Sequence, residues 1–153
     1  MVGKIIRPDG FLLHGSRSGV PQTSMQEFWA TVHWAQSGAN GLGWHATIGP
    51  GVVAVHMRPS QYGWNAGDPA SYRYIAAEFC QPNYGDPIED EQIEAYCWWV
   101  LNEVLPVWPD IPRVFVHHAQ LEQGNRAGKT DVYPNDDARQ AELIARIRRC
   151  LGW

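Results

Sequence analysis

The chain has 153 residues, 44% hydrophobic and 18% charged, a composition typical of a folded soluble protein; we expect one domain over residues 1–153 that acts as a monomer. A formal net charge of -4 and a pI near 5.8 argue against a nucleic-acid partner, because nucleic-acid binders usually present a concentrated basic surface. No apolar run reaches the roughly 20 residues of a membrane span, and the opening residues lack the apolar core of a signal peptide, so we expect neither membrane insertion nor a signal peptide.

The first half of the chain predicts a strand, a helix and a hairpin. Residues 10–14, GFLLH, read as a short buried strand that ends on a histidine and runs into a polar, flexible stretch. The letters SMQE, in capping-box form, precede apolar residues spaced as one helix face, which predicts a helix over 24–37. Residues 44–48 and 51–57 are β-rich runs around Gly49-Pro50-Gly51, which predicts a hairpin.

The second half predicts two further strands and two helices. Residues 74–80, YIAAEFC, form an apolar run with Glu78 inside it, and a carboxylate buried there needs a partner. A long helical pattern begins near Glu89 and stops at Pro106. The last strand covers 113–117, and a final helix, capped by Asn135 or Asp136, ends at Gly152. Strands interspersed with helices predict an α/β fold with a central mixed sheet flanked by helices.

Three cysteines, Cys80, Cys97 and Cys150, stand without CxxC spacing. An odd number in this spacing argues against a disulfide framework and against a cysteine-rich zinc site. All three lie in strand or helix patterns, so we expect buried free thiols.

The residues that point to chemistry are histidines at the ends of the first and last strands and Asp131 in the loop that follows. Strand ends on one edge of a sheet can converge, and two histidines with one carboxylate leave the fourth position of a zinc site for water. Bound zinc lowers the pKa of that water to about 7 and polarises a carbonyl. Adjacent residues of a strand point to opposite faces, so only one of His117 and His118 can join such a site.

Five motifs occur in an informative order: FLLH at 11–14, WHATIG at 44–49, YIAAEF at 74–79, VHHA at 116–119 and KTD at 129–131. Together they resemble the zinc amidase family of phage lysozyme-type amidases, bacterial anhydro-muropeptide amidases and peptidoglycan recognition proteins. The resemblance implies a peptidoglycan-amidase-like α/β fold and a Zn²⁺ cofactor. It also implies hydrolysis of the amide between the muramic acid lactyl group and L-alanine.

The same resemblance assigns roles to the site residues. Zinc would be bound by His14, His118 and Asp131, which selects His118 over its neighbour. Glu78 falls at the acidic position proposed to take a proton from the attacking water, and such a base needs a tuned pKa. Lys129 falls where the family places a lysine that stabilises the oxyanion of the tetrahedral intermediate.

Further residues are candidates for binding the substrate. Trp44 stands where the phage-type enzymes often have tyrosine, and it has no hydroxyl, which leaves the acid-base work to the glutamate. His45 either lines the cleft or packs beneath the site as a hydrogen-bonded histidine, and His56 is structural or cleft-lining. Trp64 and Asn65 fall in the segment with which related enzymes contact the stem peptide or the glycan strand.

We therefore expect an amidase that acts on peptidoglycan, its glycan strand and stem peptide, and most simply a phage endolysin. A cytosolic amidase that recycles soluble anhydro-muropeptides and a non-catalytic peptidoglycan-binding module are the alternatives. An endolysin would stay in the host cytoplasm until its release to the cell wall, and a recycling enzyme would stay cytoplasmic. A catalytic domain cut from a longer lysin also fits. A serine hydrolase is not supported, because the one GxSxG-like stretch has Arg17 at the nucleophile position.

Overall fold

The computed structural model describes residues 3–4, 7–16, 22–37, 43–63, 70–83, 85–121, 131–133 and 136–153. Its centre is a five-stranded sheet in the order β4-β3-β6-β2-β7. The five strands are β2 (Gly10–Ser16), β3 (Ala46–Gly49), β4 (Val52–Val55), β6 (Tyr74–Cys80) and β7 (Phe115–His117). The helices are α1 (Ser24–Gln36), α2 (Asp90–Trp99) and α4 (Asp137–Leu151). Shorter elements are β1 (Gly3–Lys4) paired with β5 (Gln61–Tyr62), η1 (Ala70–Tyr72), η2 (Val100–Val104) and η3 (His118–Gln120).

The sheet is mixed, as the sequence predicts. Strands β3, β6, β2 and β7 run parallel, and β4 is antiparallel to β3 through the predicted hairpin. Central parallel strands are covered on both faces and therefore have long apolar runs, which explains why β2 is buried along its whole length. The α/β fold with a central mixed sheet is confirmed.

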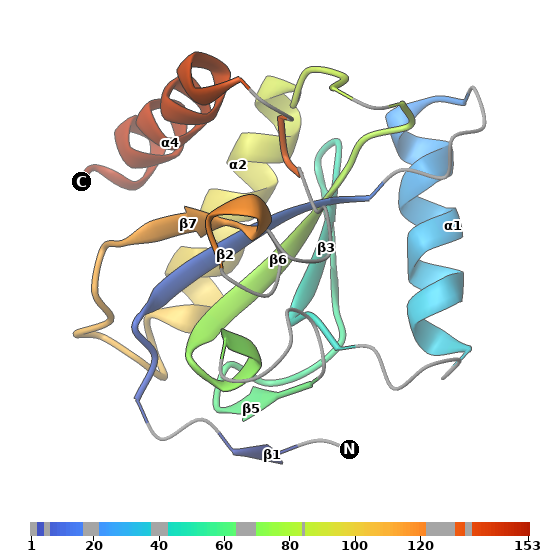
Figure 1. Cartoon of the computed structure of the whole chain (residues 1–153). Helices are drawn as coiled ribbons and strands as arrows, with labels where there is room; N and C mark the ends of the chain where they lie inside the picture. Colours follow the sequence, from blue (N-terminus) through green and yellow to red (C-terminus); the bar gives the residue numbers. More distant parts are fainter. Residues whose placement is uncertain are drawn as a thin grey trace.

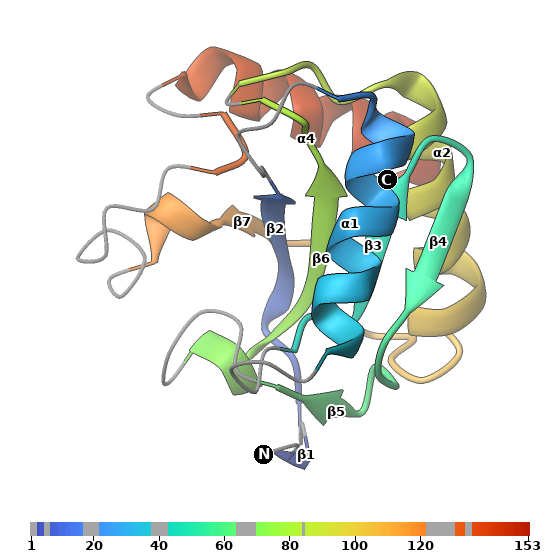
Figure 2. The same ribbon diagram turned by 90° about the vertical axis from the view of Figure 1, so that its right-hand side faces the viewer.

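The two faces of the sheet have different partners (Figures 1 and 2). On one face the main core packs against α2 and α4, with Phe11, Leu13, Ile75, Ala77 and Phe79 pointing into it. On the other face α1 packs against β3 and β6. There, smaller clusters form around Leu12 and Ala76, and around Phe28, Val32 and Cys80. Successive side chains of β2 and β6 thus point alternately into the main core and toward the face covered by α1.

Helix α2 is tied to the sheet at its beginning and changes geometry at its end. The wholly buried Gln92 donates from Nε2 to the backbone oxygens of Ile48 (3.3 Å) and Cys80 (3.1 Å), where β3 and β6 end. After Trp99 the backbone continues as the π-helical turn η2, in which Leu105 N–H bonds Val100 O at 2.9 Å. The predicted single helix up to Pro106 is therefore an α-helix followed by a π turn.

Helix α1 begins at Ser24, as predicted, but its N-cap is Thr23, one residue before the capping box read from the sequence. Thr23 is the N-cap: its hydroxyl accepts the Gln26 N–H at 3.2 Å, and Gln26 Oε1 accepts the Thr23 N–H at 2.9 Å. Glutamine in place of glutamate completes the reciprocal box. None of the helices in the described ranges is long and apolar enough to cross a membrane.

Candidate active site

A row of side chains crosses the sheet on the face shared with α1. His14 of β2 is in register with Glu78 of β6, and Glu78 is in register with Thr47 of β3. On the other side, His117 pairs with Leu13, so His118 follows beside His14. Registered residues on neighbouring strands lie roughly 5 Å apart and point to the same face. The parallel register therefore brings together residues that lie far apart in the sequence.

At one end of this row, His14, His118 and Asp131 form a compact buried group. Asp131 Oδ2 lies 3.4 Å from His14 Nδ1 and 3.5 Å from His118 Nδ1. The two imidazole rings meet edge to face with centroids 4.5 Å apart. One potential ligand atom from each residue lies within 4.8 Å of the others, and the three residues are only 4%, 7% and 5% exposed. The structure thus brings together the three residues expected to bind zinc.

The electrostatics of the group suit a cation. Burial by itself raises the pKa of Asp131, but hydrogen bonds and charge interactions with His118 and His14 outweigh it and hold the pKa well below its ordinary value. Asp131 is therefore ionised at neutral pH. Two imidazole nitrogens and one carboxylate oxygen are the donor set of a catalytic zinc site, which keeps one position for water. These residues fit zinc in number, chemistry and spacing.

The short segment 131–133 is held in place from two sides. Tyr133 OH accepts the Ile88 N–H at 2.7 Å, and its backbone oxygen accepts Gln140 Nε2–H at 2.9 Å. The Arg139 guanidinium lies 4.0 Å from the centroid of the Tyr133 ring. Helix α4 and the residues before α2 therefore fix the position of Asp131.

Gly15, next to His14, contacts both this segment and Gln81. Its N–H donates to Asp131 Oδ2 at 3.5 Å. A Cβ at this position would lie 2.0 Å from Gln81 Oε1 and 3.6 Å from the Val132 Cα. A larger residue would therefore displace the Gln81 side chain.

His117 lies away from the group, as expected for the neighbour of His118. It belongs to β7, and its N–H donates to Gln120 Oε1 at 3.0 Å. Burial lowers the pKa of His117, although Asp137 and Asp131 partly oppose this. The alternation of the strand end thus separates the two histidines, and the one selected by the family resemblance joins the group.

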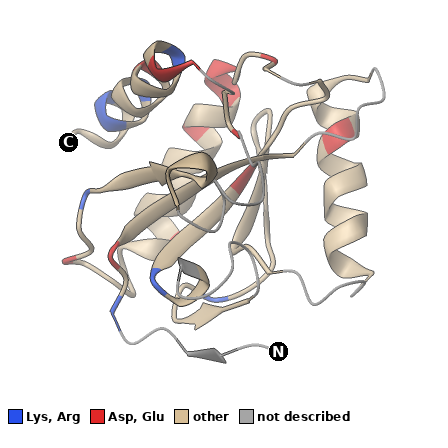
Figure 3. Ribbon diagram, in the orientation of Figure 1, with Lys and Arg blue, Asp and Glu red and all other residues tan. Residues whose placement is uncertain are grey.

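Glu78 is the one residue with a full charge in the five strands of the sheet, and Figure 3 shows it in red on β6. It is half-buried, between His14 on one neighbouring strand and Thr47 on the other. Its side chain therefore shares the face of the sheet with the three-residue group and retains access to solvent. This is the placement that a proton acceptor beside the group requires.

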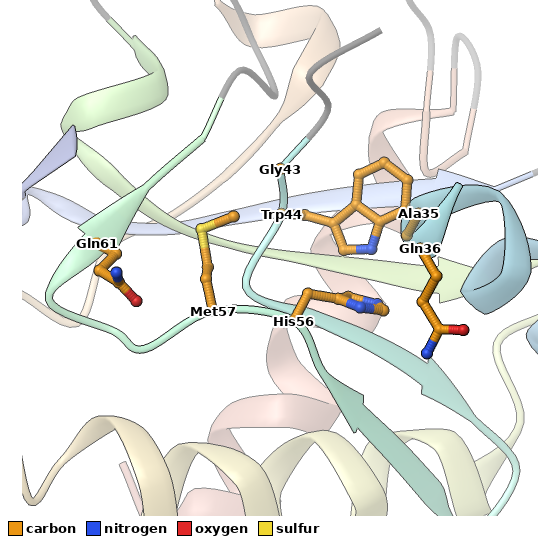
Figure 4. Close-up of a pocket in the computed structure, with 7 residues that line it drawn as sticks. All are labelled: Ala35, Gln36, Gly43, Trp44, His56, Met57 and Gln61. Carbon is orange, nitrogen blue, oxygen red and sulfur yellow. The ribbon is translucent and has the colours of Figure 1, made fainter. Parts of the chain in front are cut away.

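Beyond Thr47 lies a pocket of about 300 Å³ that is lined in part by Trp44 (Figure 4). Trp44 Nε1–H donates to Thr47 Oγ1 at 2.8 Å, and the same hydroxyl hydrogen-bonds His56 Nε2 at 2.7 Å. Trp34 stacks on the Trp44 indole with ring centroids 5.7 Å apart. Burial lowers the pKa of His56, so this ring is neutral at pH 7. The lining residues, none with a full charge, are Ala35, Gln36, Gly43, Trp44, His56, Met57 and Gln61.

His45 supports this region from beneath and has no exposed surface. Its Nε2–H donates to Gln61 O at 2.7 Å, and its Nδ1 accepts the Ala76 N–H at 3.0 Å. Burial lowers the pKa of His45 to about 4, although both backbone hydrogen bonds oppose this. Of the two readings open from the sequence, the structure matches the packed histidine, and His45 does not line the cleft. His45 therefore supports β3.

Three expected site residues, Lys129, Trp64 and Asn65, lie outside the described residues. Thr47, by contrast, was not foreseen. A threonine in a short strand does not by itself indicate a functional site. Its position between Trp44, His56 and Glu78 depends on the parallel register of the strands, which the sequence does not reveal.

No protein-family model and no curated protein sequence matches the chain. Solved structures do, and they define the class of the fold, that of endolysin and amidase catalytic domains. The catalytic domain of XlyA matches with a TM-score of 0.67 and 19% identity, covering 95% of this chain and 89% of that one. A mutant endolysin from Bacillus subtilis matches with a TM-score of 0.66 and 17% identity, covering 95% and 88%. The N-acetylmuramoyl-L-alanine amidase LysC from Clostridium intestinale has a TM-score of 0.56 and 16% identity, covering 94% and 89%. At these identities the likeness establishes the fold that the sequence motifs predict.

Proposed function

We propose that this chain is a zinc-dependent N-acetylmuramoyl-L-alanine amidase that cleaves peptidoglycan between the muramic acid lactyl group and L-alanine. The observation that carries the proposal is the buried group of His14, His118 and Asp131 next to Glu78, the one charged residue of the sheet. The fold supports it, because structural neighbours include an N-acetylmuramoyl-L-alanine amidase and an endolysin.

His14, His118 and Asp131 would hold the metal. Zinc bound there would supply a Lewis acid that polarises the substrate carbonyl and lowers the pKa of water. Asp131 enters as a carboxylate, and its Oδ2 contacts both imidazoles and the Gly15 N–H, so it also fixes the orientation of the rings. Burial of all three keeps competing solvent away from the group.

Glu78 is the proposed general base and acid. Its position one strand from His14 lets a carboxylate oxygen take a proton from the attacking water. The same oxygen then returns the proton to the nitrogen of L-alanine, which leaves as an amine. Lys129, two residues before Asp131 in the sequence, is proposed to stabilise the negative charge that develops on the carbonyl oxygen.

The pocket around Trp44 and His56 is proposed to hold a neighbouring part of the substrate. It lies on the same face as Glu78, one strand further across the sheet. Its lining has an aromatic ring, two glutamine amides and no full charge, which suits an uncharged polar group. Trp64 and Asn65 are proposed to add contacts to the glycan or stem peptide.

In the proposed biological setting the protein is a monomeric phage endolysin. It would lie in the host cytoplasm until released to the wall, where its activity lyses bacteria. The endolysin among the structural neighbours favours this setting over recycling of soluble fragments.

Digestion of intact sacculi, compared with soluble anhydro-muropeptides, tests the proposal. We expect new amino-terminal L-alanine and intact glycan strands in the digested sacculi, read by mass spectrometry. New reducing sugar ends without free L-alanine would contradict amidase activity. Cleavage of soluble fragments alone would instead assign the chain to recycling.

A further inference from the structure

We propose that Cys97 and Cys150 form a thiol–disulfide modification site that links α2 covalently to α4. The two cysteines lie far apart in the sequence, but their helices pack against each other behind the sheet. The site is separate from the candidate active site and does not depend on the proposed function.

The contacts place Cys97 against the part of α4 that carries Cys150. Cys97 Sγ lies 3.8 Å from the backbone oxygen of Ile147, to which it donates a weak hydrogen bond. Ile147 and Cys150 are three residues apart in α4, and residues at this spacing are neighbours on one helix face. Cys150 is also near enough to Cys97 to contribute to the raised pKa of the Cys97 thiol. The two cysteines therefore lie at the same contact between α2 and α4.

The two thiols differ in access to solvent. Cys97 is 2% exposed, whereas Cys150 is exposed, in contrast to the buried thiol expected from the sequence. Burial, reinforced by the neighbouring Cys150, raises the pKa of the Cys97 thiol. A reagent from solution therefore meets Cys150 first, and Cys97 can react only with a sulfur already in place beside it.

The oxidant is a small-molecule disulfide such as glutathione disulfide. The Cys150 thiolate attacks one sulfur of the oxidant, forms a mixed disulfide and releases one reduced thiol. Cys97, on losing its proton, then attacks Cys150 Sγ, which breaks the mixed disulfide and releases the second reduced thiol. Two protein thiols become one disulfide, and one molecule of oxidant becomes two thiols.

The link would act on the segment that carries a proposed metal ligand. Helix α4 contacts Tyr133 through Gln140 and Arg139, and Tyr133 is two residues from Asp131. A covalent bond between α4 and α2 would close a long loop that includes this segment. The bond would therefore restrict the unfolded chain and hold α4 against the core.

The test is oxidation of the folded, full-length chain in glutathione buffers, with thiol counting under denaturing conditions and peptide mapping. We expect two of the three thiols to disappear, a mass lower by two hydrogen atoms, and a peptide joining Cys97 to Cys150. The melting temperature should rise by roughly 5 to 10 °C on oxidation and fall back to its original value when the disulfide is reduced. Cys80, buried on the other face, should remain a thiol and serves as the internal control.

C150S, a change at an exposed position, should fold normally, keep its thiols in oxidising buffer and show no rise in melting temperature. C97S should stop at the mixed disulfide on Cys150. Three intact thiols in the wild type after prolonged oxidation would overturn the proposal. A wild type that stops at the mixed disulfide, as C97S does, would overturn it equally.

Discussion

Glu78 illustrates how one residue distinguishes a reactive site from a buried metal site. A carboxylate within a sheet loses hydration, and this cost is offset only by partners or by access to water. The structure places Glu78 in register with His14 and leaves it half-buried, so it combines proximity to the three-residue group with contact to solvent. The aspartate of the group is instead held as a ligand by two histidines.

Glu78→Gln keeps the size of the side chain and removes its ability to accept a proton. We expect the rate of peptidoglycan hydrolysis to fall about 100- to 10,000-fold, the usual contribution of a general base. Zinc content, measured by elemental analysis, should be unchanged. Near wild-type turnover in this variant would refute the assignment of the base.

The adjacent histidines offer a matched pair of variants. His118→Ala removes one of the three grouped side chains, so the purified protein should lose most of its zinc, from about one ion per chain, together with its activity. His117→Ala changes a residue of the same type that lies outside the group and should retain zinc. If the His117 variant lost zinc and the His118 variant kept it, the proposed ligand set would be wrong.

At the scale of elements, the site depends on the close approach of β2 and the segment 131–133. Gly15 donates its N–H to Asp131 Oδ2 at this approach, and a Cβ at Gly15 would meet the Gln81 amide oxygen. Gln81 itself is anchored by a 2.7 Å hydrogen bond from Nε2 to Asp86 O. Gly15 and Gln81 therefore pack too closely to admit a larger side chain at residue 15.

Gly15→Ala should lower the free energy of unfolding, measured by urea titration, by about 1 to 3 kcal/mol, as expected for an overpacked site. Because the clash is with the Gln81 side chain, Gly15→Ala in a Gln81→Ala background should cost less than in the wild type. Strict additivity of the two changes would show that the glycine is not required by this contact.

The anchoring of β3 by His45 makes stability depend on pH. The folded pKa of His45 is about 4 against an ordinary value of 6.5, so between these values the unfolded chain binds more protons than the folded one. The stability from the neutral, buried ring is complete above pH 6.5 and is lost as the pH falls toward 4. This difference corresponds to about 3 kcal/mol.

Urea unfolding from pH 7 to pH 4, with chelator throughout to remove any effect of zinc, measures this dependence. His45→Gln, which does not titrate, should lose about 3 kcal/mol less than the wild type over the same range. Parallel curves for the two proteins would contradict the role given to His45.

Local patterns in the sequence predict most of the elements, because strands such as β6 are short apolar runs and helices such as α1 have clear periodicity and end signals. The order of the parallel strands is not a local property, so the row from His14 to Thr47 emerges only in the structure. The burial of His45 has the same origin, since both of its ring partners come from other segments. The motif resemblance placed His14, His118 and Asp131 together, which spacing alone left open.

Across the whole molecule, the main hydrophobic core and the proposed active site lie on opposite faces of one sheet. The large core faces α2 and α4, and the face toward α1 carries the three-residue group, Glu78 and the Trp44 pocket. This division allows polar residues on one face without breaking the core on the other. The fold is shared with the catalytic domain of XlyA and with an endolysin at 19% and 17% sequence identity.

The most direct test of the central claim is hydrolysis of purified sacculi before and after complete removal of metal, with release of L-alanine amino termini as the readout. We expect hydrolysis to stop in the metal-free protein and to return when about one equivalent of zinc per chain is added. Undiminished release of L-alanine termini from a protein shown to contain no metal would contradict the zinc mechanism.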